Sequence, residues 1–412
     1  MRTVASNTGA IGFVFRLIRQ PTLVSAMTFA VSGAAFALGN LLLARQLPVE
    51  AFGRVALVIA LFNVLILLAP LGIDQQIARR RIDPGIRLLA LLLASALAMG
   101  VAVAVTVVAF GGFQASEAAW LVVMTLAGCV TITASMTLRM RQRPWAALTM
   151  ATIASFILLT IGLAALAFDL HDAEWPLALF AIGNVAAAIW GWSMLQRSCR
   201  VPEADREPIL WREAMSLLGI AFIGAVSLQI ERIVIPIPLD LRDLALFSVL
   251  ASVAIFPFRL LTAGVNFTVV PRLKAASSVS ARYRVLRSEL LLLGGIVALA
   301  WPVIIFLAPP VTTLVTDGGY AISYALATAA CCNGTVKILM VVPRAVLTAC
   351  GSDRDLAALN RLGIVWVVLA VGGAFVGAQG GLTGLIWGVS LGGLLATLPA
   401  ANLARRRLTE GL

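Results

Sequence analysis

The chain has 412 residues, of which 61% are hydrophobic and only 12% are charged, and its mean hydropathy is +0.99. A soluble domain cannot cover its surface with so few charges. The composition therefore excludes soluble enzymes, disordered chains and disulfide-rich secreted folds, and it predicts an integral membrane protein. The length allows about twelve membrane spans of roughly 20 residues each. The chain carries 31 basic and 19 acidic residues, a formal net charge of +12.

Continuous apolar runs predict twelve membrane-spanning helices. The runs do not alternate between polar and apolar residues with a period of two, so they favour helices over a β-barrel. In chain order they cover Thr22–Leu43, Val55–Ile73, Leu88–Phe110, Ala118–Leu138, Trp145–Phe168, Pro176–Leu195, Ala214–Ile237, Leu244–Val270, Leu290–Leu307, Tyr320–Ala349, Leu362–Ala378 and Leu382–Leu403. Asp74, just after the second run, is expected to be a solvated residue at the end of a span.

The basic residues are unevenly distributed over the connections between these runs. Most of them lie at the termini and in the even-numbered connections, whereas the odd-numbered connections carry only Arg45, Arg54 and Arg242. Short loops rich in Lys and Arg remain in the cytoplasm, so both termini are predicted to be cytoplasmic. This asymmetry accounts for most of the positive charge, and no nucleic-acid partner is expected.

The two halves of the chain resemble each other. Glu50 and Asp243 lie in turns after the first and seventh runs, and Arg79 and Arg272 follow the second and eighth runs at the same interval in sequence. A repeat of six spans enters the membrane from one side in both copies, which predicts parallel lobes. We expect a cytoplasmic amphipathic segment at 1–20, an N-lobe at 21–195, a cytoplasmic linker at 196–213, a C-lobe at 214–404 and a tail at 405–412.

Several turns carry a family resemblance that extends over nearly the whole chain. The stretch from Leu41 to Gly53 resembles the first periplasmic turn of Wzx-type polysaccharide flippases, of the MOP exporter superfamily. Further similar features are Leu71-Gly72 with Arg79-Arg80-Arg81, the eighth span with Pro271-Arg272-Leu273 after it, and the turn Gly380-Gly381-Leu382-Thr383-Gly384. The resemblance implies an all-α integral membrane protein with two six-helix lobes around a central cavity and transport by alternating access. The chain departs from the pattern in having only two lysines.

Basic residues inside the predicted spans are candidates for a substrate site. A central arginine in hydrocarbon costs about 2.5–3.5 kcal/mol on insertion scales, so each one requires an explanation. The candidates are Arg259, Lys337, Arg232, Arg344 and, at the outer end of the first span, Arg45. A cationic cavity suits an anionic substrate, because guanidinium groups match phosphate oxygens. Separate interhelical hydrogen bonds, or a side chain that reaches out to the membrane surface, are the structural alternatives.

Polar residues recur at helical spacing beside these cations. Ser252 and Asn266 share the face of Arg259, Asn333 lies one turn before Lys337, and Asn40 ends a polar stripe on the first span. These four are predicted to line the same cavity. Glu231 is the one carboxylate well inside a span, and it is a candidate for coupling transport to H⁺ or Na⁺.

The leading hypothesis is translocation of an undecaprenyl-diphosphate-linked oligosaccharide from the cytoplasmic to the periplasmic leaflet, for assembly of exopolysaccharide, O-antigen or capsule. The alternatives are a MATE-like ion-coupled exporter of small molecules and a membrane-embedded polysaccharide polymerase. An exporter of cations would need more buried carboxylates, and a polymerase would need a large external loop. No enzymatic activity, cofactor or metal is expected. The expected partners are the lipid-linked substrate, membrane lipids and other polysaccharide-assembly proteins.

Overall fold

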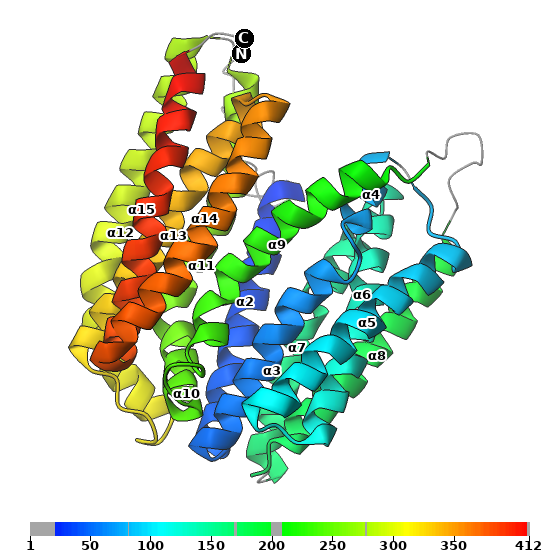
Figure 1. Cartoon of the computed structure of the whole chain (residues 1–412), viewed down its shortest axis with the longest axis vertical. Coiled ribbons are helices and arrows are strands. Elements are labelled where there is room, and N and C mark those ends of the chain that lie inside the picture. The colour runs from blue at the N-terminus through cyan, green and yellow to red at the C-terminus, as the bar shows by residue number, and fades with distance from the viewer. Residues whose placement is uncertain (1–20, 81, 169–170, 199–207, 277, 410–412) are drawn as a thin grey trace, which may run out of the picture.

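The described part of the chain is helical, with no strand in residues 21–80, 82–168, 171–198, 208–276 and 278–409 of this computed structural model. Figure 1 shows long helices that run roughly side by side. The helices are α2 (Pro21–Gln46), α3 (Val49–Leu68), α4 (Ile73–Arg80), α5 (Ile86–Gly111), α6 (Ala115–Met140), α7 (Pro144–Phe168), α8 (Glu174–Arg197), α9 (Trp211–Val234), α10 (Leu241–Leu250), η2 (Ala251–Ile255), α11 (Phe256–Ala275), α12 (Val279–Val315), α13 (Tyr324–Cys350), α14 (Asp353–Gly377), η3 (Ala378–Gly380) and α15 (Gly381–Thr409).

The predicted twelve-span architecture is confirmed. In the described chain, eleven helical stretches are long and apolar enough to cross a membrane, and the last of them, Arg354–Leu408, contains both α14 and α15. The eighth span consists of α10, η2 and α11 in succession. The protein is therefore a multi-pass membrane protein.

The helices form two bundles that meet along α2, α3 and α9 to α11. In Figure 1 the helices α3 to α8 lie on one side, α11 to α15 lie on the other, and α9 crosses between them. We call the face where α2 begins and α15 ends the terminal face, and the face where α3 and α10 begin the opposite face. Parts of three predicted segments, 1–20, the linker 196–213 and the tail 405–412, fall outside the described residues.

A break after α3 separates the span from a short helix, α4, that the sequence analysis did not predict. Leu71 and Gly72 have positive φ angles of 55° and 74°, so the chain turns out of α3 and begins again as α4. A Cβ atom on Gly72 would lie 2.2 Å from the carbonyl oxygen of Ala214, because the start of α9 packs directly on this turn. The predicted second span, Val55–Ile73, therefore begins earlier, at Val49, and ends earlier, at Leu68.

The eighth span contains a π-helical turn, η2, immediately before Pro257. Proline lacks a backbone N–H and crowds the preceding turn of a helix, and a widened π turn accommodates both defects. An extra residue rotates all later side chains by about 100° around the helix axis. Ser252 and Arg259, which the regular spacing placed on one face, consequently lie on different faces of the span.

The two bundles are in close contact at the opposite face. A Cβ atom on Gly53 of α3 would lie 2.2 Å from the carbonyl oxygen of Leu241, at the start of α10. The ring of Phe52 packs edge-on against Tyr320, with their centroids 6.2 Å apart. Side chains of this region are fully buried, including Phe52, Leu244 and Ile235. The opposite face is therefore closed in this conformation.

Candidate functional site

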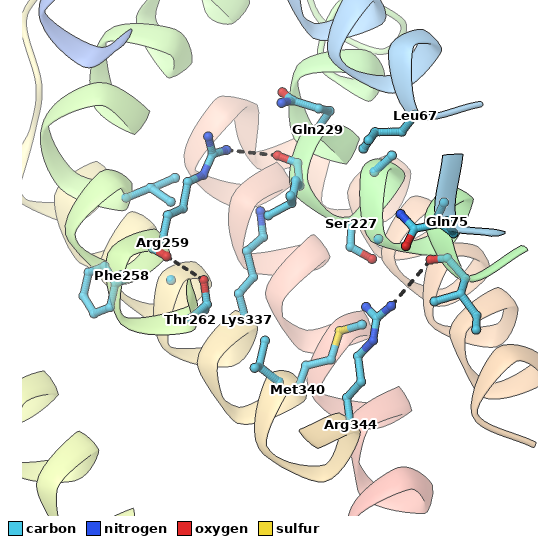
Figure 2. Close-up of a pocket in the computed structure, with 18 of the residues that line it drawn as sticks. Leu67, Gln75, Ser227, Gln229, Phe258, Arg259, Thr262, Lys337, Met340 and Arg344 are labelled. Atoms are coloured by element: carbon cyan, nitrogen blue, oxygen red, sulfur yellow. Dashed lines mark hydrogen bonds between the residues drawn. The ribbon is translucent and has the colours of Figure 1, made fainter. Parts of the chain in front are cut away.

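A cavity of about 570 Å³ lies between the two bundles, mostly against the second one. The first bundle contributes Leu67 at the end of α3 and Gln75 of α4, and the remaining wall comes from α9, η2, α11 and α13. Its polar lining residues are Gln75, Ser227, Gln229, Arg259, Thr262, Lys337 and Arg344. Figure 2 shows the basic side chains around this space, Arg259 from α11 and Lys337 and Arg344 from α13. The cavity extends from the middle of α13 toward α4 at the terminal face.

Arg259 lies in the wall of this cavity. Its Nη2 atom donates a hydrogen bond to the carbonyl oxygen of Leu228 in α9, 2.9 Å away (Figure 2). Its buried Nε atom has no hydrogen-bond partner in the described chain. The guanidinium group is thus anchored to α9 by one edge and retains donors that protein groups do not use.

Lys337 is also in the cavity wall, and its ammonium group contacts Glu231. Lys337 Nζ lies 2.8 Å from Oε1 and 2.9 Å from Oε2 of Glu231, and Asn333 Nδ2 donates to Oε1 at 3.0 Å. Glu231 is 0% and Lys337 9% exposed. The structure thus brings together three residues of the predicted site. Glu231 and Lys337 form a buried ion pair that joins α9 to α13, and Asn333 adds a hydrogen bond to the glutamate.

Arg344 lies two turns further along α13, toward the terminal face. Its Nη2 atom is 3.5 Å from the carbonyl oxygen of Ile220, at the long limit of a hydrogen bond. Arg344, Ile220 and Met340 also line a second cavity of about 670 Å³ within the second bundle. Its polar lining residues are Lys274, Arg344, Thr348, Asn360 and Thr397. Arg344 therefore stands on the boundary between two adjoining spaces.

Arg232 and Arg45 do not line the interlobe cavity. Arg232 is 2% exposed, donates to Gln229 Oε1 at 3.3 Å and lies 5.9 Å from the ring centroid of Phe36 in α2. It faces the first bundle because it follows Glu231 directly, and adjacent helical residues point in different directions. Arg45 is exposed at the opposite face, with Asp317 Oδ2 3.7 Å away.

The smaller polar residues of the predicted site do not line this cavity. Asn40 is buried and donates to the carbonyl oxygen of Phe36 at 3.0 Å, and Ser252 donates to that of Ser248 at 2.9 Å. Both therefore satisfy their polar groups within their own helix, as polar side chains commonly do in apolar surroundings. Asn333 contacts Glu231, as described above. The side chain of Asn266 lies outside the described part of the structure.

The structure adds polar residues that the sequence analysis did not identify. Gln75 enters the wall because the chain breaks after α3, a feature that a continuous apolar run conceals. Asp74, expected to be solvated, is 1% exposed, and this expectation is wrong. The short helix α4 is folded back against α6 and α9, which removes the carboxyl group from water. The pair Leu71-Gly72 was the available signal, since a glycine before a polar segment favours a turn.

Charges around the interlobe cavity are predominantly positive. In the described chain, Arg259, Lys337 and Arg344 line it and Arg232 lies directly behind it, whereas Glu231 is the one carboxylate in contact with any of them. Because Glu231 neutralises a single cation, the site retains excess positive charge. Such a site can bind an anion with several oxygen atoms, by hydrogen bonds from cations on α11 and α13.

Comparisons with known proteins identify the architecture. No protein-family model and no curated protein matches the sequence. Among solved structures, the chain is similar to "Inward-facing conformation of a multidrug resistance MATE family transporter of the MOP superfamily", with a TM-score of 0.70 and 16% identity over 94% of this chain and 98% of that one. The fold is that of the MOP-superfamily transporters. This confirms the expected arrangement of two helical lobes around a central cavity.

Two further structures with this fold have different described roles. One is "Lipid II flippase MurJ, inward closed conformation", with a TM-score of 0.60 and 13% identity over 92% of this chain and 87% of that one. The other is a transporter from Pyrococcus furiosus, described under the words "Reverse polarity of binding pocket suggests different function of a MOP superfamily transporter", with a TM-score of 0.61 and 14% identity over 99% of both chains. Since the fold accommodates different substrates, the residues of the cavity must indicate the substrate class.

Proposed function

We propose that the protein translocates an undecaprenyl-diphosphate-linked oligosaccharide across the bacterial inner membrane by alternating access. The observation that carries this proposal is the excess of cations over carboxylates at the interlobe cavity, with Arg259 and Lys337 at its middle. A diphosphate presents several anionic oxygens. Arginine binds such oxygens through two parallel donors, whereas lysine acts as a point charge.

The conformation supports loading from the terminal face, which the distribution of basic residues predicts to be cytoplasmic. The bundles are in contact around Gly53 and Leu241 at the opposite face, while the cavity extends to Gln75 of α4 at the terminal face. In an alternating-access cycle this is the state that receives a substrate from the cytoplasmic leaflet. Separation of α3 from α10 would then release it on the periplasmic side.

The alternatives have less support from the cavity. A MATE-like exporter of organic cations would benefit from carboxylates in the cavity wall, but Glu231 already contacts Lys337 and Asn333. A polymerase would need groups that activate a sugar hydroxyl. In the described chain, the polar wall offers Arg259, Lys337, Arg344 and neutral side chains rather than a pair of carboxylates.

Inversion of a lipid-linked sugar in proteoliposomes tests the proposal. The variant Arg259→Ala should abolish inversion and Arg259→Lys should impair it clearly, because lysine cannot reproduce the planar fork. Arg287→Ala, which removes an exposed arginine of α12, is the matched control and should invert the substrate at the wild-type rate. Wild-type rates in Arg259→Ala would show that the cationic cavity does not bind the substrate.

A further inference from the structure

Two carboxylates near the interlobe cavity, Glu231 and Asp74, are buried, but only Glu231 is paired with a cation. Glu231 has a cation against both of its oxygens and an amide donor on one of them. A coupling ion at Glu231 would have to compete with Lys337, which is covalently attached and already in place. Breaking such a buried pair leaves an uncompensated charge and is unfavourable. Glu231 is therefore poorly suited to bind and release an ion in each transport cycle.

Asp74 of α4 lacks any such compensation. Its side chain is 1% exposed, Oδ2 accepts one hydrogen bond from Gln75 Nε2 at 3.2 Å, and buried Oδ1 has no partner in the described chain. No cation of the described residues pairs with it. A buried carboxylate without a cation or a full set of donors favours its neutral, protonated form.

The groups packed around Asp74 do not supply the missing charge. From α6, the Cys129 thiol lies within electrostatic range of Asp74, and it donates to the carbonyl oxygen of Leu92 at 3.7 Å. From α9, Glu213 pairs with Arg80, 2.5 Å away, so this cation is already engaged. Gln76, the next polar residue of α4, bonds the backbone of Leu210 in both directions. Burial accordingly raises the pKa of Asp74 to about 6, despite the opposing hydrogen bonds from Gln75.

Asp74 also lies on a helix, α4, that contacts the helix connecting the two lobes. Helix α4 belongs to the first bundle, and it holds the first turn of α9 through the contacts of Gln76 and Arg80. The last turn of α9 is held to the second bundle by Glu231 and Lys337. The neighbour of Asp74, Gln75, lines the interlobe cavity. A change in how α4 packs against α9 is therefore transmitted along α9, the helix that joins the two lobes.

We propose that Asp74 is the proton-binding site through which a proton gradient is coupled to transport. The coupling to transport in this proposal rests on the proposed function, but proton binding at Asp74 of α4 can be tested independently of it. With its proton bound, Asp74 is neutral and α4 remains packed against α9. When the proton leaves, the buried carboxylate favours hydration, and α4 separates from α9. Protonation of Asp74 therefore favours packing of α4 against α9, and this packing in turn favours protonation of Asp74.

Hydrogen exchange of the amides of Ile73–Arg80, measured in purified protein at several pH values and corrected for intrinsic rates, tests the linkage. In the wild type, protection should fall as the pH rises through about 6, by up to about a hundredfold, the ratio that a pKa moved from 3.8 to about 6 implies. Asp74→Asn should abolish this pH dependence. Glu117→Gln, which alters a buried carboxylate already paired with Arg54, should retain it.

Proteoliposomes with an imposed pH gradient test the coupling. Inversion of an undecaprenyl-diphosphate-linked sugar should accelerate with the gradient in the wild type and in the control Arg287→Ala, but not in Asp74→Asn or Asp74→Ser. A pH-independent α4 in the wild type, or gradient stimulation retained in Asp74→Asn, would overturn the proposal. If the wild type inverts no lipid-linked sugar but α4 shows the expected pH dependence, the proposed substrate is wrong and the proton site stands.

Discussion

Glu50 and Arg242 bind each other across the lobe interface, with Nε of the arginine 2.9 Å from Oε1 of the glutamate. They belong to the two turns that the sequence relates as copies, one after the first span and one after the seventh. The equivalent turns of the two lobes therefore meet at the opposite face. Both side chains are more than half exposed, so this ion pair contributes at most about 1 kcal/mol. The tighter contact, between Gly53 and Leu241, is the stronger determinant of closure.

Gly53→Ala should shift the protein away from the closed opposite face. The added Cβ would lie 2.2 Å from the carbonyl oxygen of Leu241, and overpacking of this kind costs about 1–3 kcal/mol. Spin labels at Asp172 and Ile237, both exposed, would report longer separations in the variant. Gly294→Ala, where a Cβ meets nothing within 4 Å, is the control and should give the wild-type distances. Equal distributions in all three proteins would mean that Gly53 does not limit closure.

Lys337→Met should destabilise the fold. Methionine has a length similar to that of lysine but no charge, so Glu231 remains buried without its cation. Loss of one partner of a buried ion pair costs about 3–5 kcal/mol. The double variant Lys337→Met, Glu231→Met should recover much of the stability, because neither charge is then buried. Thermal unfolding in detergent micelles measures both effects. A double variant no more stable than Lys337→Met would argue against the ion pair as the cause.

Apolar runs and the asymmetry of basic residues sufficed to predict the spans, because each span must be long, apolar and helical to cross a bilayer. Spacing alone was less informative about the site. It placed Arg259 and Ser252 on one face, and the π turn before Pro257 separated them. It also could not show that Arg232 turns to Phe36 of α2, since this depends on which helix packs alongside.

The topology predicted from the sequence can be tested in a cysteine-free background. Asp172, after α7, and Arg354, at the start of α14, are exposed at the opposite and terminal faces respectively. Asp172→Cys should react with an impermeant thiol reagent added to intact cells, and Arg354→Cys only after the inner membrane is opened. Labelling of both positions from the same side would contradict twelve spans, and exchanged sides would reverse the predicted orientation.

The stability of the protein should decrease as the pH rises through the pKa of Asp74. Burial raises this pKa from 3.8 to about 6, so the folded state binds a proton more tightly than the unfolded state. The contribution of Asp74 to stability is therefore fully present below about pH 4 and is lost as the pH rises through about 6, by an amount on the order of 3 kcal/mol. Asp74→Asn removes the titration, and its stability relative to the wild type should increase between about pH 4 and pH 7. Thermal unfolding of both proteins in detergent over this range measures the difference. A constant difference would mean that water or lipid headgroups solvate the carboxylate, and that Asp74 is charged throughout.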